Sequence, residues 1–266
     1  MHKRKITDVM NYFNSAAAAE RYSKGRPRFH SNTIKHIRDY LQLDEKVDSA
    51  LDVGCGTGLS TEALLQIARN VYGTDISERM LEFAIHKDRI RYLVAAAEQQ
   101  PFADSTFDLI TVSSGVHWFD IDKFLTEANR LLKSKSWLAI YENHFIAEMV
   151  GVDEFADWFA SVYLKKLPSP PRNNAYAWNA ENLRPKNLVF LTEEKFKNSV
   201  RLSKSQLALY FTTQSNIIAA VEKGEITYPQ VEKWLNEQLA LFFKDDGSPR
   251  TINYGNWIKY FQRMDQ

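Results

Sequence analysis

The chain has 266 residues, of which 44% are hydrophobic and 25% charged, and its formal net charge at pH 7 is +1. This length can form one large α/β domain or two small ones around a sizeable core, and the balanced charge argues against a general attraction to nucleic acid or to an anionic membrane. The single cysteine, Cys55, excludes an intrachain disulfide and a cysteine-based zinc site and suits the reducing cytoplasm, where we expect the protein.

Strands and helices alternate through the first half of the chain. A helix over 12–24 ends at Gly25 and Pro27, and Ser31 is the expected N-cap of a second helix. Strands are predicted over 49–53, 71–74, 91–95, 107–113 and 137–141, and helices over 59–68, after Ser77 and over 122–132. This alternation predicts a parallel sheet covered by helices. Ligands of such sheets bind beyond the carboxyl ends of the strands.

The pattern changes after residue 145. A proline-rich loop is expected over 167–172, a strand over 196–202, helices over 207–221 and 231–243, and an edge strand over 251–261. Two sets of side chains are ambiguous. Tyr141 and His144 follow the fifth strand and are candidate substrate contacts, and the aromatic residues form either a substrate lid or ordinary core: Tyr163, Tyr176, Trp178, Tyr210 and Phe211.

These elements predict an α/β fold with a Rossmann-like, seven-stranded, mostly parallel sheet, helices on both faces and a helical cover over the active site. We expect a single domain over 1–266. Its parts are a core over about 30–145, an N-terminal lid segment over 1–29, and a C-terminal cover with edge strands over 146–266.

A glycine-rich turn follows the first predicted strand, in the sequence Leu51-Asp-Val-Gly-Cys-Gly-Thr-Gly58. Glycines let the backbone turn sharply and approach a ligand closely, and the following helix would present backbone N–H groups at its N-terminus. This order of strand, turn and helix favours a nucleotide-like cofactor.

The spacing narrows the choice of cofactor. Asp75 lies 21 residues after Gly54, where a carboxylate can accept hydrogen bonds from both ribose hydroxyls; the alternative is an aspartate that caps the next helix. Position 59 is Leu, so the pattern Gly-x-Gly-x-Gly departs from the Gly-x-Gly-x-x-Gly fingerprint of dinucleotide folds. The turn also lacks the Gly-Lys-Ser/Thr ending of phosphate-binding ATPases.

Four ordered motifs resemble those of class I S-adenosylmethionine (SAM)-dependent methyltransferases over roughly residues 12–142: the glycine turn, Gly73–Ser77 with Met80, Ala97-Glu98, and Pro101–Asp108. Two segments, Tyr22–Pro27 and Ser113–Asp120, are similar to those of small-molecule enzymes of the trans-aconitate methyltransferase-like group. Two positions depart from the family pattern. Ala96 stands where an Asp or Asn is usual, and Phe29-His30 replaces a usual Tyr-Pro.

The resemblance implies a set of SAM contacts. The glycines would pass under the methionine part of SAM, Asp75 would bind the ribose, and Ile76 and Met80 would pack on the adenine faces. Backbone at Ala97, with the Glu98 side chain nearby, would meet the adenine edge, and Arg26 would bind the methionine carboxylate. The full set of expected cofactor-binding residues is Arg26, Gly54, Gly56, Gly58, Asp75, Ile76, Met80, Ala97, Glu98, Ser113 and Ser114, with no metal.

The function implied is transfer of a methyl group from SAM to a small-molecule acceptor, at a carboxylate or hydroxyl oxygen, by direct displacement. A carboxylate is already ionised at neutral pH, whereas a hydroxyl needs a base. His117 is the candidate catalytic base, and its alternative role is to shape the SAM pocket. The alternative function is that of a SAM-binding regulatory or partner subunit without its own acceptor. We expect no nucleic-acid or membrane partner and a monomer or homodimer.

Overall fold

The computed structural model describes residues 15–170, 176–245 and 247–265. The predicted start of the first helix at 12–14 and the end of the predicted loop at 171–172 lie outside the described residues. The chain divides into two compact units. Unit 1 comprises Met1–Phe29, His144–Pro171 and Lys197–Gly255, and unit 2 comprises His30–Asn143, Arg172–Phe196 and Asn256–Gln266. The expected single methyltransferase domain stays a prediction.

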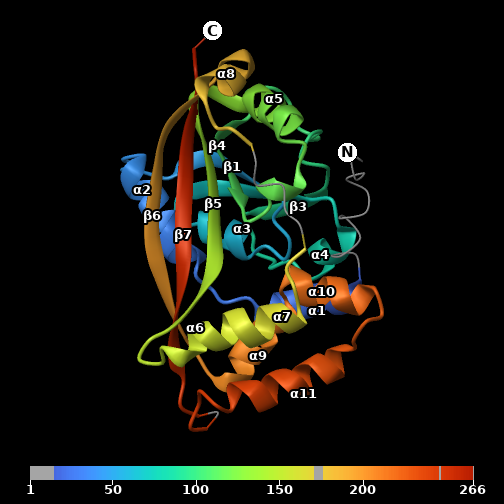
Figure 1. Cartoon of the computed structure of the whole chain (residues 1–266). Helices are drawn as coiled ribbons and strands as arrows, with labels where there is room; N and C mark the ends of the chain where they lie inside the picture. The colour runs from blue at the N-terminus through green and yellow to red at the C-terminus, as the bar shows by residue number, and fades with distance from the viewer. Residues whose placement is uncertain (1–14, 171–175, 246, 266) are drawn as a thin grey trace. The chain divides into compact units, whose positions relative to one another are not determined.

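A seven-stranded sheet with the order β3-β2-β1-β4-β5-β7-β6 runs through the described residues (Figure 1). Its strands are β1 (Val47–Val53), β2 (Ala68–Asp75), β3 (Ile90–Val94), β4 (Phe107–Ser113), β5 (Leu132–Met149), β6 (Leu188–Leu202) and β7 (Arg250–Arg263). β1 pairs in parallel with β2 and β4, β2 with β3, and β4 with β5. The predicted seven-stranded, mostly parallel sheet is confirmed, although β5, β6 and β7 are longer than expected.

Helices cover both faces of the sheet in unit 2. On one face, Ala50 and Ala139 pack with Ile34 and Ile37 of α2 (His30–Tyr40) and with α3 (Leu59–Leu64). Alternate strand residues face the other way, where Leu51 packs with α5 (Ile121–Leu131). This division follows from the strand, whose successive side chains point to opposite faces. The shorter elements of unit 2 are α4 (Glu78–Glu82), the 3₁₀ helices Val116–Trp118 and Arg184–Lys186, and α8 (Ala180–Leu183).

Two helix starts in unit 2 were predicted from serine caps. The Ser77 side chain accepts a hydrogen bond from Met80 N and caps α4, as expected. The Ser31 prediction is wrong, because α2 begins at His30 and places Ser31 inside the helix, where its hydroxyl accepts from Gln66 Nε2 at 3.0 Å. α3 also ends at Leu64, earlier than predicted, because β2 already begins at Ala68.

Unit 1 is mainly helical, and α1, α10 and α11 pack around α9 (Figure 1). Its helices are α1 (Ala16–Gly25), α6 (Glu154–Trp158), the π-helix Phe159–Tyr163, α7 (Leu164–Lys166), α9 (Lys204–Thr212), α10 (Ser215–Glu222) and α11 (Tyr228–Leu239). The helix predicted over 207–221 is therefore two helices. The break falls at Thr213-Gln214, where α9 has ended and Gln214 becomes the N-cap of α10.

The aromatic residues of the second half mostly fill cores. In unit 1, Tyr163, Tyr210 and Phe211 are at most 1% exposed, and Phe145 packs against Phe155, Phe159, Tyr210 and Phe211. In unit 2, Trp178 packs on Phe261, and Tyr176 donates to Asp122 Oδ1 at 3.0 Å. Core packing thus accounts for these rings without a substrate lid.

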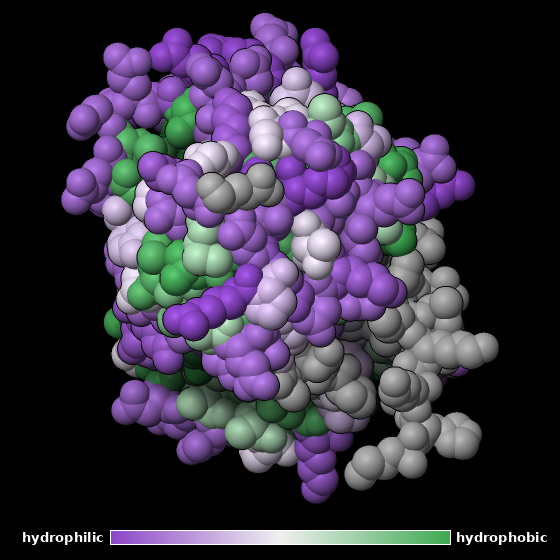
Figure 2. Space-filling model, turned by 90° about the horizontal axis from the view of Figure 1, so that it is seen from above, coloured by the Kyte–Doolittle hydropathy of each residue, from purple (hydrophilic) through white to green (hydrophobic). Residues whose placement is uncertain are grey.

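The surface is mixed. Figure 2 shows one face on which hydrophilic side chains dominate and hydrophobic ones gather in small separate groups. Within the described residues, no helix has both the length and the apolar character that a membrane crossing requires.

Candidate cofactor and active site

The glycine turn between β1 and α3 is closed on the end of β2. Gly54, Gly56 and Gly58 have φ of +70°, +55° and +79°, in the left-handed region that favours glycine. Gly54 N and Cys55 N both donate to Thr74 O, at 2.7 and 3.0 Å. The turn is thereby joined to the last residues of the neighbouring strand before α3 begins.

Aromatic side chains press against this turn. A Cβ added at Gly58 would lie 2.2 Å from the Tyr92 hydroxyl, and one at Gly73 would lie 2.7 Å from the Tyr92 ring. On the other side, a Cβ at Gly54 would lie 3.1 Å from Cζ of Phe119. The glycines are therefore required by close packing as well as by backbone conformation.

Asp75 connects the glycine turn to the start of α4. Its carboxylate accepts from Gly56 N through Oδ2 and from Ser77 N through Oδ1, both at 2.8 Å. Burial raises the pKa of Asp75, and the backbone N–H bonds oppose that rise. A carboxylate can accept about four hydrogen bonds, so acceptor capacity remains for ribose hydroxyls. The cap of α4 is Ser77, and the position of Asp75 fits the predicted ribose contact.

The residues expected around adenine lie on the segments that follow β2 and β3. Ile76 is 48% exposed, whereas Met80 is only 4% exposed. Ala97 is buried, and Glu98 accepts from Asp120 N at 2.7 Å, which ties this segment to the N-cap of α5. Ile76 thus offers an open apolar surface to a flat ring, while one oxygen of Glu98 is engaged in a structural bond.

The carboxyl end of β4 carries the third group of predicted residues. Ser113 ends β4, and Ser114 has φ +54° while its N–H donates to Tyr141 O at 2.9 Å. A non-glycine residue with positive φ is uncommon, and such residues cluster at functional sites. His117 follows in the 3₁₀ helix Val116–Trp118 and is half-buried, with its ring 4.6 Å from that of Trp118.

The other predicted side chains have contacts of their own. Tyr141 is 1% exposed, and its hydroxyl lies 3.1 Å from His30 Nδ1. His144 lies in unit 1 and is exposed, with its ring over Gly255. Arg26 also lies in unit 1, where its Nη2 donates to Thr213 O at 3.0 Å. Its contact with the methionine carboxylate stays a prediction.

Asp52 is a site residue to which the sequence analysis gave no role. It is completely buried in β1 and accepts from Ser60 Oγ at 2.6 Å, Thr61 Oγ1 at 2.8 Å and Thr111 Oγ1 at 3.0 Å. Burial raises the pKa of Asp52 to about 6, against the effect of the three hydroxyls. Asp52 therefore fixes the first turn of α3 to β1 and β4. The signal was a carboxylate inside an apolar strand.

Cys55 is a buried packing residue. It is free and 5% exposed, and burial raises the pKa of its thiol well above the usual value. Reactivity of cysteine depends on the thiolate, so this residue is unsuited to nucleophilic chemistry. No group of side chains suited to hold a metal ion occurs within the part of the chain that is described.

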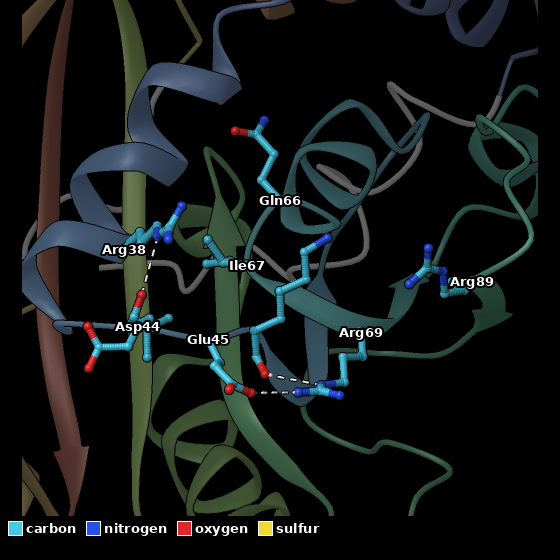
Figure 3. Close-up of a pocket in the computed structure, with 9 residues that line it drawn as sticks. Arg38, Asp44, Glu45, Gln66, Ile67, Arg69 and Arg89 are labelled. Atoms are coloured by element: carbon cyan, nitrogen blue, oxygen red, sulfur yellow. Dashed lines mark hydrogen bonds and ion pairs between the residues drawn. The ribbon is translucent and has the colours of Figure 1, made fainter.

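A pocket of about 500 Å³ lies at the opposite, amino-terminal edge of the strands (Figure 3). Its cations are engaged with the protein itself: Arg69 pairs with Glu45 at 3.0 Å, Arg38 Nε donates to Leu43 O at 3.2 Å, and Lys46 Nζ donates to Leu65 O at 2.6 Å. Ligands of open α/β sheets bind at the carboxyl ends. We therefore place the candidate site at the glycine turn.

Comparison with known proteins agrees with this placement. Residues 51–140 match the family model of a methyltransferase domain, and this range contains the glycine turn, Asp75, Ala97-Glu98 and Ser113–His117. The match supports SAM as the cofactor. The resident groups fit it, because Asp75 keeps acceptor capacity at the end of β2 and Ile76 exposes an apolar side chain beside it.

Curated relatives cover part of the chain. A candidate methyltransferase of Dictyostelium discoideum is 33% identical over 120 residues, which is 45% of each chain. The demethylmenaquinone methyltransferase of Corynebacterium urealyticum is 32% identical over 143 residues, 52% of this chain and 60% of that one. The chain thus spans about half the length of the curated relatives it matches.

A solved structure covers more of the chain. A candidate type II methyltransferase from Anaeromyxobacter dehalogenans has a TM-score of 0.71 at 18% identity, covering 91% of this chain and 99% of that one. At this level of identity the likeness shows the fold. The predicted Rossmann-like α/β fold of methyltransferases is confirmed.

Gly58 and Gly224 separate backbone strain from steric crowding. Both have left-handed φ, but a Cβ at Gly224 would meet nothing within 4 Å, whereas one at Gly58 would clash with Tyr92. We expect Gly224→Ala to lower the free energy of unfolding by roughly 1–2 kcal/mol and Gly58→Ala by about 1–3 kcal/mol more. Urea denaturation measures both, and equal losses would contradict the packing described here.

Asp52 should give the stability a characteristic pH dependence. Because its pKa rises from 3.8 to about 6 on folding, the folded state binds more protons between these values. Its contribution to stability is therefore full below pH 4 and is lost as pH rises through 6. Relative to Asp52→Asn, which does not titrate, the wild-type free energy of unfolding should fall by up to about 3 kcal/mol from pH 4 to 7. Parallel curves from urea denaturation would contradict this role.

Proposed function

We propose that this protein is a class I SAM-dependent methyltransferase that acts on a small-molecule acceptor, at a carboxylate or hydroxyl oxygen. The observation that carries the proposal is the Asp75 carboxylate, which is bonded to Gly56 N and Ser77 N at the meeting point of β1 and β2. The resemblance of Tyr22–Pro27 and Ser113–Asp120 to the trans-aconitate methyltransferase-like group supports a small acceptor.

The names of the relatives point in the same direction. One is a demethylmenaquinone methyltransferase. Another, from Pelagibacter ubique, is named a ubiquinone biosynthesis O-methyltransferase and is 26% identical over 149 residues. Both names describe methylation of small molecules, and the second specifies oxygen.

SAM, when bound, supplies an activated methyl group on a sulfonium. In our proposal Asp75 binds the ribose hydroxyls, the turn of Gly54, Gly56 and Gly58 follows the methionine part, and Ile76 packs on adenine. The remaining proposed cofactor contacts are Met80, Ala97, Glu98, Ser113 and Ser114. Such contacts fix the methyl donor in position, and positioning supplies much of the rate of a displacement reaction.

His117 is the proposed base for a hydroxyl acceptor. It is half-buried and follows β4 at the end that carries the glycine turn in β1. A carboxylate acceptor would need no proton removed, because it is ionised near neutral pH. Among class I methyltransferases with a hydroxyl acceptor, an imidazole in hydrogen-bonding reach would take the hydroxyl proton as the methyl group is transferred.

Calorimetry with S-adenosylhomocysteine tests the cofactor site. Asp75→Ala should weaken binding by at least about 30-fold, because a charged acceptor contributes roughly 1.5–3 kcal/mol per hydrogen bond. Asp75→Asn keeps one acceptor and should lie between. Asp48→Ala, an exposed change in the same sheet at the other end of β1, is the matched control and should bind as the wild type does. Equal affinity of Asp75→Ala and wild type would refute the ribose contact.

Turnover tests the base. Release of S-adenosylhomocysteine is measured with panels of phenols, alcohols and carboxylic acids. With a hydroxyl acceptor, His117→Gln should lower kcat by about 100-fold or more and leave the affinity for S-adenosylhomocysteine unchanged. An unchanged kcat with such an acceptor would remove His117 from the chemistry. Tight cofactor binding without turnover on any of these acceptors would favour the regulatory or partner subunit instead.

A further inference from the structure

Unit 1 contains a buried arginine that has no acidic partner. Arg26 directly follows α1, and its guanidinium lies 4.5 Å from the ring centroid of Tyr22 and 5.4 Å from that of Tyr210. Nη2 donates to Thr213 O, but Nε is buried without a hydrogen-bond partner. Among the residues with described placement, no ion pair to a carboxylate is formed by Arg26. A buried cation without a counter-charge is costly.

The chain is built to place Arg26 at the junction of α9 and α10. A Cβ on Gly25 would lie 2.7 Å from Thr213 Cγ2 and 2.9 Å from Leu209 O, so only glycine allows α1 to approach α9 this closely. The conformation of Gly25 is ordinary, and space alone demands glycine here. This explains the Gly-Arg pair within the Tyr22–Pro27 motif.

Two further polar groups at this junction lack partners. Gln214 is the N-cap residue of α10 but makes no capping bond with its side chain, and its buried Nε2 is without a partner. Tyr254 is fully buried, its hydroxyl meets no partner at hydrogen-bonding geometry, and its ring centroid lies 5.3 Å from that of Tyr210. Unsatisfied buried polar groups are rare in native proteins and call for an explanation.

All three orphaned groups are hydrogen-bond donors. Burial raises the pKa of Tyr254 well above its usual value, and that of Tyr210 to about 12. Both hydroxyls therefore stay protonated at neutral pH. The positive charge of Arg26 acts on both tyrosines, and the N-terminus of α10 adds partial positive charge. Such a set of groups suits an anion.

A neighbouring arginine shows that the missing acid is specific to this place. Arg21 lies in the same helix, and its guanidinium lies 4.1 Å from the ring centroid of Tyr228. Unlike Arg26, it forms an ion pair with Glu232. Stacking on tyrosine therefore does not replace a carboxylate partner in this unit.

We propose that Arg26, Gln214 and Tyr254 form a subsite for a carboxylate group of a bound small molecule. The planar fork of arginine matches a carboxylate, and the amide and phenol complete a set of three donors. The inference rests on the proposed function, which provides two sources of a carboxylate: the methionine part of SAM and the methyl acceptor. Gln214 and Tyr254 would then connect the C-terminal half of the chain to ligand recognition.

The experiment compares Arg26→Gln, Gln214→Leu and Tyr254→Phe with the wild type. Calorimetry is done with S-adenosylhomocysteine and with 5′-methylthioadenosine, which lacks the amino-acid part. Each variant should weaken S-adenosylhomocysteine by about tenfold or more and leave 5′-methylthioadenosine unchanged if the carboxylate belongs to SAM. Tyr254→Phe removes one hydroxyl and keeps the ring in the core, which preserves the fold.

A second arm tests the acceptor as the source. Thermal unfolding is followed with sodium acetate, succinate, citrate and benzoate against sodium chloride at equal ionic strength. If the acceptor supplies the carboxylate, at least one salt should raise the unfolding temperature of the wild type and not of the variants, while S-adenosylhomocysteine binds all of them equally. This arm is independent of cofactor binding, so it still decides the subsite if the wild type fails to bind S-adenosylhomocysteine and the proposed function is wrong.

Arg21→Gln is the matched control and should behave as the wild type in both arms, because Arg21 already has an acidic partner. Arg26→Lys keeps the charge but loses the fork, and should lie between the wild type and Arg26→Gln. The proposal is overturned if folded variants bind S-adenosylhomocysteine as the wild type does and no carboxylate distinguishes them from it.

Discussion

The candidate site depends on one bonded junction, in which the end of β2 holds the glycine turn that follows β1. Thr74 O accepts two turn N–H groups and Asp75 accepts a third. The turn can take this course only because Gly54, Gly56 and Gly58 adopt left-handed φ. The same carboxylate bonds Ser77 N, so the starts of α3 and α4 are both referred to a single side chain.

Packing and buried polar bonds make this junction rigid from several sides. Tyr92 fills the space beside Gly58 and Gly73, and Phe119 lies against Gly54. Beneath the turn, Asp52 bonds three hydroxyls from α3 and β4. A ligand that meets a preformed site loses less free energy to ordering. The structure therefore invests its glycines, one buried carboxylate and two aromatic rings in a fixed backbone at the carboxyl ends of the strands.

Local patterns in the sequence predicted the sheet, the glycine turn and the Ser77 cap, because each depends on residues close in the chain. What depends on distant contacts was missed. The helix predicted over 207–221 breaks at Thr213-Gln214, where Gly25 packs against Thr213. Similarly, the role of Asp52 needs Thr111, which is 59 positions away. No local period could show that Gln214 and Tyr254 belong beside Arg26.

The most direct test is a crystal structure with S-adenosylhomocysteine bound. We expect both ribose hydroxyls to donate to Asp75, with adenine against Ile76 and the homocysteine part along the turn of Gly54, Gly56 and Gly58. The bonds from Gly56 N and Ser77 N to Asp75 should persist in that complex, because the site is already formed. A ligand bound elsewhere, with Asp75 facing solvent, would contradict the account.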